Sequence, residues 1–328
     1  MQDFRAPRWL PGGNLQTIWP SLFSHSHLGV MPRYTRERWD TPDGDFVDVD
    51  HLVADATHAA PAVDAPWLVL FHGLESSSAS RYALAFAHSA RSRGWRFSVP
   101  HFRGCSGELN RAPRAYHSGD FEEVGWMLQR LRARHAAPLL AAGVSLGGNA
   151  LLRWAEEAGA SAAHTVRALA AISSPLDLAA AGHAIDGGFN RLVYSRMFLR
   201  TMKPKALAKL QQHPGLFNRE RLLAARTLHE FDDAFTAPLH GFRDADDYWL
   251  RASAKPHLRR IHIPALLLNA RNDPFVPARS LPTAREVGHG ITLWQPAHGG
   301  HVGFPEPPFP GRVTGMAEAV ADWLAAAA

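Results

Sequence analysis

Gly143-Val144-Ser145-Leu146-Gly147 is the most informative segment of this 328-residue sequence. An apolar run, residues 139–144, precedes the serine, and an amphipathic stretch begins at Asn149. A G-x-S-x-G pentapeptide between a strand and a helix is typical of a nucleophile turn, because glycines avoid collisions with the helix and leave the serine hydroxyl exposed. The N-terminus of that helix stabilises negative charge near Leu146. Ser145 is therefore the predicted nucleophile.

Short apolar segments alternate with amphipathic ones along most of the chain. The predicted strands are residues 34–39, 46–53, 67–71, 96–99, 139–144, 166–172, 265–269 and 291–294. The predicted helices are residues 81–93, 121–134, 149–158, 281–287 and 313–324. The first two strands are expected to form an edge hairpin around Pro42-Asp43-Gly44, and the later ones are nearly all apolar, as in a parallel sheet covered on both faces. The pattern predicts an α/β fold with a mostly parallel sheet flanked by helices.

Residues 176–260 interrupt this alternation, since they contain helix-forming segments and no convincing strand. We expect an inserted helical cap there, on a core made of residues 1–175 and 261–328. One cap segment has apolar side chains at helical spacing: Phe189, Leu192, Val193 and Met197, with Phe198 and Leu199 alongside. Such a helix either roofs an acyl-binding pocket or packs on the core, and its neighbouring arginines and lysines also suit a peripheral contact with an anionic membrane surface.

Composition excludes several classes of protein. The chain is 46% hydrophobic and carries a formal charge of +5, but its basic residues are scattered and no nucleic-acid-binding motif is present, so no nucleic-acid partner is expected. Cys105 is the only cysteine, which rules out an internal disulfide and a CxxC zinc site. Residues 1–20 lack the apolar core of a secretion signal, and no apolar run is long enough to cross a bilayer. We therefore expect a cytoplasmic protein, and the sequence carries no signal for its oligomeric state.

A serine nucleophile needs a base and an acid that orients the base. Asp273 follows the predicted strand 265–269 and is the expected acid, although Asp-Pro is also a common turn former. Asp177, which equally well starts a cap helix, is the rival acid. His301 follows the last strand in a glycine-rich loop and is the expected base, with His298 as the alternative.

Two further features complete the predicted site. The chain order serine, aspartate, histidine is that of an α/β-hydrolase. The stabilising N–H groups for a substrate oxygen anion are expected from Leu146 and from Leu74, where Gly73 permits a close approach of the backbone. The pair His298 and His301 lacks a companion cysteine or carboxylate at a recognised ligand spacing, so neither a metal nor a cofactor is expected.

Several motifs together resemble the YheT-like branch of the α/β-hydrolase superfamily, which is related to the eukaryotic abhydrolase-domain lipases and the yeast medium-chain ethyl-ester synthase/esterases. The motifs are WLPGGNLQTI (9–18), HGLE (72–75), RGCSGE (103–108), YHSGD (116–120), GVSLGGN (143–149) and the histidine loop (298–304). The resemblance covers nearly the whole chain and implies the triad Ser145, Asp273 and His301. It also implies hydrolysis of esters with medium acyl chains or of monoacylglycerol-like esters. Asn14 departs from the histidine expected in many relatives, at a position expected to lie away from the chemistry.

These observations predict a serine hydrolase that acts on a small-molecule carboxylic ester through an acyl-enzyme on Ser145. An acyltransferase or ester synthase would use the same residues with an alcohol in place of water. A noncatalytic binding protein that keeps the fold is a third hypothesis, which the intact triad disfavours. Epoxide hydrolase or dehalogenase chemistry generally needs an aspartate at the position of Ser145. The polar, glycine-rich segment 103–120 is expected to brace the sheet, with Cys105 as a buried thiol.

Overall fold

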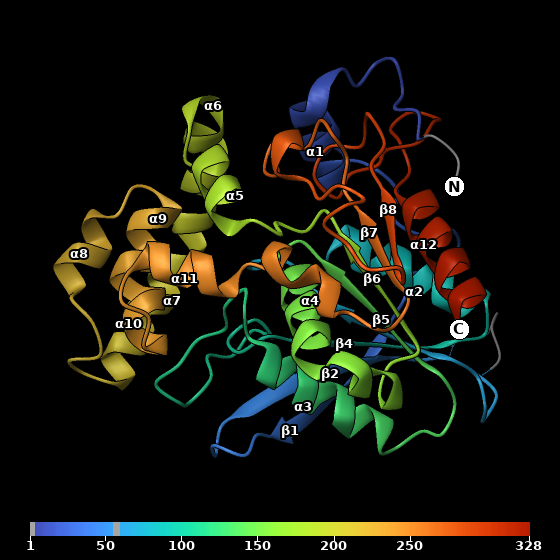
Figure 1. Cartoon of the computed structure of the whole chain (residues 1–328), viewed down its shortest axis with the longest axis horizontal. Coiled ribbons are helices and arrows are strands. Elements are labelled where there is room, and N and C mark those ends of the chain that lie inside the picture. Colours follow the sequence, from blue (N-terminus) through green and yellow to red (C-terminus); the bar gives the residue numbers. More distant parts are fainter. Residues whose placement is uncertain (1–3, 55–59) are drawn as a thin grey trace.

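The computed structural model describes residues 4–54 and 60–328, and its centre is a sheet of eight strands (Figure 1). The strands are β1 (Tyr34–Asp40), β2 (Phe46–Leu52), β3 (Trp67–Phe71), β4 (Arg96–Pro100), β5 (Leu139–Val144), β6 (Ala168–Ile172), β7 (Ala265–Leu268) and β8 (Ile291–Trp294). Their order across the sheet is β1-β2-β4-β3-β5-β6-β7-β8. The edge strands β1 and β2 form the predicted antiparallel hairpin, and β2 pairs antiparallel with β4. All pairs from β4 to β8 are parallel, which confirms the predicted α/β fold.

Helices cover both faces of the sheet. They are α2 (Arg81–Ser92), α3 (Phe121–Arg132), α4 (Leu146–Ala158) and α12 (Thr314–Ala327). Because side chains alternate along a strand, β3 contributes Leu68 and Leu70 to the core with α2 and α12, and Val69 and Phe71 to the core with α3 and α4. Both cores are closed to water, which explains why the central strands are apolar throughout.

Between β6 and β7 the chain forms helices and loops. These are α5 (Leu178–Ile185), α6 (Gly188–Asn190), the π-helix η2 (Arg191–Ser195), α7 (Arg196–Gln212), α8 (Arg219–Ala224), α9 (Leu228–Phe231), the π-helix η3 (Asp232–Thr236), α10 (Ala237–His240), α11 (Ala245–Ala252) and the 3₁₀-helix η4 (Lys255–Arg260). Most of them gather at one side of the sheet in Figure 1, in yellow and orange. We call residues 176–260 the cap; its division from the core as a separate domain stays a prediction.

Three shorter helical elements complete the described chain: α1 (Gly12–Leu22), η1 (Gly159–His164) and η5 (Ala278–Ser280). The helix predicted for residues 281–287 is wrong, because this segment forms turns. Pro282 and Gly288 leave room for a single turn only, in which the Glu286 carboxylate accepts hydrogen bonds from the backbone N–H and the hydroxyl of Thr283. The apolar periodicity there belongs to a loop that packs on the core.

The prediction that the apolar side chains of one cap helix roof a pocket or pack on the core is also wrong in part. Phe189, Leu192 and Met197 are exposed, with 55%, 63% and 51% of their surface accessible, so they neither roof a pocket nor pack on the core. The π-helix η2 lies between α6 and α7 and changes the angular register of the side chains, which uniform helical spacing does not anticipate. Val193 and Phe198 do pack inward, against the cluster around Phe275.

The loop 103–120 is fixed to the sheet hairpin, as predicted. The buried Arg103 guanidinium donates to Asp43, Asp45 and Glu123 at 2.7–2.8 Å. Asp45 also accepts from the backbone of the loop at residues 111 and 112. Cys105 is buried, and burial raises the pKa of its thiol to about 12, so it is a poor nucleophile. Among residues 4–54 and 60–328, no helix is long and apolar enough to span a membrane.

Candidate active site

Ser145 lies at the turn between β5 and α4, in a conformation that few non-glycine residues adopt. Its backbone has φ 54° and ψ −121°. A Cβ on Gly143 would come within 2.5 Å of the Gly147 carbonyl oxygen, and one on Gly147 within 2.4 Å of the His72 carbonyl oxygen. Only glycine fits at either position, so the strand and the helix can approach closely enough to force the strained turn. The pentapeptide has the steric role predicted for it.

The three side chains predicted as a triad lie in one hydrogen-bonded row. Nε2 of His301 is 3.0 Å from Oγ of Ser145, and Nδ1 of His301 is 2.9 Å from Oδ2 of Asp273. The Asp273 carboxylate only accepts, so Nδ1 carries the proton and Nε2 is left to accept from the serine hydroxyl. The other oxygen of Asp273 accepts from the backbone N–H of Phe275 and Val276. These bonds hold the carboxylate in place.

The rival residues lie elsewhere. Asp177 accepts a hydrogen bond at 3.0 Å from the backbone N–H of Ala180 and so caps α5, the structural alternative considered for it. His298 is exposed, and its nearest polar contact is the side chain of Asn272. Neither lies in the row that contains Ser145.

The loop after β3 lies against the serine, as the predicted anion-binding role requires. A Cβ on Gly73 would be 3.3 Å from Cβ of Ser145, and the side chains of Leu74 and Leu146 line the same cavity as Ser145. Two tyrosines hold this loop: the hydroxyl of Tyr82 accepts from the backbone N–H of Gly73, and that of Tyr116 accepts from the N–H of residue 75, both at 2.9 Å. Sequence reasoning missed both tyrosines, because they lie 9 and 41 residues away.

Backbone strain in the described chain is concentrated around this site. The non-glycine residues with positive φ are Glu75, Ser145, Ser173, Val302 and Phe304. They follow β3, β5, β6 and β8 at the carboxyl ends of the parallel strands. Such conformations cost about 1–3 kcal/mol each and persist where surrounding contacts impose them, which is common at functional sites. The edge of the sheet that holds Ser145 is therefore strained as a whole.

Helix α1 braces the loops that carry the acid and the histidine, a role that sequence reasoning did not predict. The buried Gln16 accepts hydrogen bonds at 2.9 Å from Asn272 and from the backbone N–H of Gly299. The hydroxyl of Thr17 accepts at 2.8 Å from the backbone N–H of His301. The motif at residues 9–18 was the available signal for this contact.

Asn14 therefore lies closer to the site than predicted. Its side-chain oxygen accepts at 2.8 Å from the hydroxyl of Tyr194, whose ring packs on Phe275 beside Asp273. Burial raises the pKa of Tyr194 to about 12, so this hydroxyl keeps its proton and remains the donor. The departure from histidine at position 14 concerns a contact between α1 and the cap.

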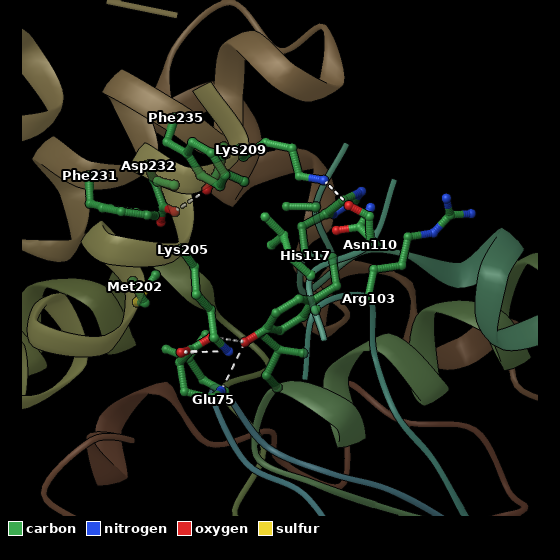
Figure 2. A pocket seen from close by; sticks show the side chains of 18 of the residues that line it. Glu75, Arg103, Asn110, His117, Met202, Lys205, Lys209, Phe231, Asp232 and Phe235 are labelled. Carbon is green, nitrogen blue, oxygen red and sulfur yellow. Dashed lines mark hydrogen bonds and ion pairs between the residues drawn. The ribbon is translucent and has the colours of Figure 1, made fainter. Parts of the chain in front are cut away.

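Two adjoining cavities lie between the core and the cap. The first, which we call the serine cavity, has a volume of about 100 Å³ and is lined mainly by apolar residues, with Ser145 in its wall. The second, which we call the polar cavity, has about 70 Å³ and is shown in Figure 2. Five residues line both cavities: Leu74, Leu146, Met202, Asp232 and Tyr248. In the described part of the chain no three His, Cys, Asp or Glu side chains are grouped to hold a metal ion.

Comparisons with known proteins agree with this architecture. Residues 66–308 match the model of the alpha/beta hydrolase fold family. The chain is 40% identical to "Putative esterase YheT" of Escherichia coli over 92% of this chain and 87% of that protein. It is 31% identical to "Phospholipase ABHD3" of Mus musculus over 87% of this chain and 69% of that protein.

A solved structure shows the same fold at low sequence identity. The Pyrococcus furiosus esterase Pf2001 aligns with a TM-score of 0.53 and 14% identity over 90% of each chain. The family match covers most of this chain, and the two relatives are similar along nearly all of it. The chain therefore belongs to the α/β-hydrolase family, as an esterase- or lipase-like member of the YheT-like branch.

Proposed function

We propose that this protein hydrolyses carboxylic esters through an acyl-enzyme on Ser145. The observation that carries the proposal is the row of hydrogen bonds from Ser145 through His301 to Asp273, at the edge of a cavity with apolar walls. Ser145 attacks the ester carbonyl while Nε2 of His301 takes its proton and later returns it to the leaving alcohol. Asp273 orients the imidazole and stabilises its charged form.

The backbone N–H groups of Leu74 and Leu146 donate to the oxygen anion of the tetrahedral intermediate. Each such donor is worth about 3 kcal/mol in the barrier. Water then attacks the acyl-enzyme with His301 as the base, which frees the acid and restores the serine. A cap over the serine cavity keeps bulk water away from these hydrogen bonds and strengthens them.

The proposed substrates are uncharged esters with medium acyl chains or monoacylglycerol-like esters. The serine cavity supports this, because an acyl chain of moderate length meets mostly aliphatic and aromatic walls there. Similarity to proteins named esterase and phospholipase supports the same class of substrate.

A fluorophosphonate probe tests the nucleophile. Labelling of the wild type and none of Ser145→Ala supports the proposal, and esterase activity of Ser145→Ala should fall by about 10⁴-fold or more. Absence of labelling and of activity in the folded wild type would favour a binding protein instead. p-Nitrophenyl esters of graded chain length then measure the acyl preference, and added alcohol tests for acyl transfer in place of hydrolysis.

The chain offers matched controls for the acid and the base. Asp273→Asn and His301→Gln should lower kcat by about 10³- to 10⁴-fold, because the serine loses its oriented base. Asp177→Asn and His298→Gln should stay within about twofold of the wild type, since neither lies in the row. Asp177→Asn should also keep its stability, because asparagine caps a helix about as well as aspartate. The assignment would be wrong if Asp177→Asn lost as much kcat as Asp273→Asn, or if His298→Gln lost as much as His301→Gln.

A further inference from the structure

Asp232 is a carboxylate in the wall shared by the serine cavity and the polar cavity. It lies at the first position of the π-helix η3, an element that often occurs at functional sites. In Figure 2, Asp232 lies with Phe231 and Phe235 on the cap helices, away from Glu75 of the core. It is the only carboxylate among the residues that line the serine cavity. The mechanism above does not use it.

Only neutral protein donors contact this carboxylate. Oδ1 accepts at 2.7 Å from the hydroxyl of Thr236, and Oδ2 accepts at 2.8 Å from the indole N–H of Trp249. Within residues 4–54 and 60–328, no lysine, arginine or histidine forms an ion pair with it, in contrast to the nearby Glu75, which pairs with Lys205 at 3.0 Å. A carboxylate has room for about four hydrogen bonds, so each oxygen can accept another from a ligand in the cavity. Burial raises the pKa of Asp232 to about 6, so the group is ionised at neutral pH.

The charges around the polar cavity favour a neutral donor over a cationic one. Lys205 and Lys209 both line it, and Lys209 donates to the backbone carbonyls of Asn110 and Ala112 without a carboxylate partner. A ligand ammonium group would approach these cations as well as Asp232. A hydroxyl group donates to the carboxylate without that repulsion.

The two cavities differ in the number of charged residues that line them. Beyond Ser145, the serine cavity continues along apolar cap residues such as Leu178, Ile185 and Phe198, which suit an acyl chain. The polar cavity adds polar side chains that already bond to protein groups, and apolar side chains such as Phe231 and Phe235, so it suits a small alcohol whose hydroxyl reaches Asp232. An ester whose carbonyl lies at Leu74 and Leu146 reaches both, because these residues line both cavities.

We propose that Asp232 accepts a hydrogen bond from a free hydroxyl group on the alcohol part of the substrate. Asp232 thereby selects partial esters of polyhydric alcohols, of the monoacylglycerol type, over esters of simple alkyl alcohols. This inference rests on the proposed function and names the residue that selects among the proposed substrates at the same site. An alkyl ester would displace water from the carboxylate without supplying a hydrogen bond in its place, which costs binding free energy.

Two esters of equal size test the inference: 2-hydroxyethyl octanoate and propyl octanoate, which differ only in OH against CH₃. The readout is the ratio of their kcat/KM values, which compares binding and acylation for the two alcohols and does not contain the hydrolysis of the acyl-enzyme that both esters share. We expect the wild type to favour the hydroxyethyl ester by about tenfold or more, the size of a hydrogen bond to a charged group. Asp232→Asn should lower the ratio at least about threefold, and Asp232→Leu, which removes every acceptor, should bring it to one or below.

Asp233→Asn is the matched control. Asp233 is the next residue of the same helix, but it pairs with Arg221 and lines neither cavity, so the ratio should stay at the wild-type value. Asp232→Glu, which keeps the charge, should retain a preference for the hydroxyethyl ester. Thermal unfolding of each variant confirms that a folded protein is compared.

Three outcomes would overturn the inference: a wild-type ratio of one or below, a ratio unchanged in folded Asp232→Asn and Asp232→Leu, or an equal fall in Asp233→Asn. If Asp232→Leu does not fold, the nearly isosteric Asp232→Asn, compared with Asp233→Asn, decides the outcome. Failure of the proposed function has a different signature, since neither ester would then be hydrolysed and the fluorophosphonate probe would not label Ser145.

Discussion

Gln16 joins the loop that carries Asp273 to the loop that carries His301. Its side-chain oxygen accepts from Asn272, next to the acid, and from the backbone N–H of Gly299. Its amide nitrogen donates at 2.8 Å to the Leu10 carbonyl oxygen, so all of its polar atoms are used. Gln16 is a positioning residue by this geometry, because it touches neither Ser145 nor a cavity.

Gln16→Met tests this positioning role. Methionine has a similar length but leaves the Gly299 N–H and the Asn272 amide without an acceptor, so the distance between the loops is no longer held. We expect kcat for a p-nitrophenyl ester to fall about tenfold with little change in KM, equivalent to about 1.4 kcal/mol in the barrier. The rate of fluorophosphonate labelling of Ser145 should fall in parallel.

Leu15→Ala is the control for this experiment, because it changes an exposed neighbour on the same helix and should behave as the wild type. A lower unfolding temperature of Gln16→Met with an unchanged kcat would show that Gln16 serves stability alone.

At the scale of the element, the segment α6–η2–α7 carries exposed apolar and basic side chains together. Phe189, Leu192 and Met197 are exposed, and an open groove beside them is lined by Arg191, Arg196, Arg200, Lys203 and Arg226. Apolar groups that enter the acyl boundary and cations that meet anionic headgroups are the two features of an interfacial helix. The same residues that fail to roof the cavity are available for such a contact.

The prediction is that this protein binds vesicles that contain anionic phospholipid and binds neutral vesicles much less. Replacing Phe189, Leu192 and Met197 together by alanine should lower the fraction that sediments with anionic vesicles at least about threefold, because buried apolar area is lost. The control replaces the exposed Leu223 and Leu250, elsewhere on the cap, by alanine, and it should sediment as the wild type does. Equal sedimentation of all three proteins would show that this element makes no membrane contact.

At the scale of the whole molecule, a pair of histidines lies where the cap meets the core. The rings of His117 in the loop 103–120 and His240 in α10 are 4.4 Å apart. Burial lowers the pKa of both, that of His240 to about 3, and His117 disfavours the charged form of His240. Arg114 and Asp120 also face the pair. Arg114 lowers the pKa of both histidines, and Asp120 raises it.

This pair predicts that stability falls on mild acidification. Between about pH 6.5 and pH 3 the unfolded chain protonates these histidines and the folded chain does not, so the free energy of unfolding decreases as the pH falls. We expect His240→Gln to remove on the order of 1 kcal/mol of the difference between pH 7 and pH 5, as measured by urea unfolding. His164→Gln, at an exposed histidine, should leave the difference unchanged. An unchanged pH dependence in His240→Gln would refute the role of the pair.

The alternating α/β order, the parallel sheet and the nucleophile turn could all be predicted from the sequence. Their causes are local: apolar strands buried on both faces follow from composition, and Gly143 and Gly147 are required by contacts within a few residues of Ser145. The error at residues 281–287 has a local cause as well, since the proline and the glycine at its ends limit it to one turn. The error in the cap came from a π-helix, which changes the register without any sequence signature.

The packing of distant elements determines which of the expected and the rival residues meet Ser145. Asp177 and Asp273 both follow a strand, yet only Asp273 lies beside His301, because the direction of each loop depends on what packs over it. The contact of Gln16 with Asn272 spans 256 residues, and Asp232 enters the cavity on a helix of the cap. Such contacts depend on how elements distant in the chain pack against each other, and local patterns of polarity carry no record of that packing.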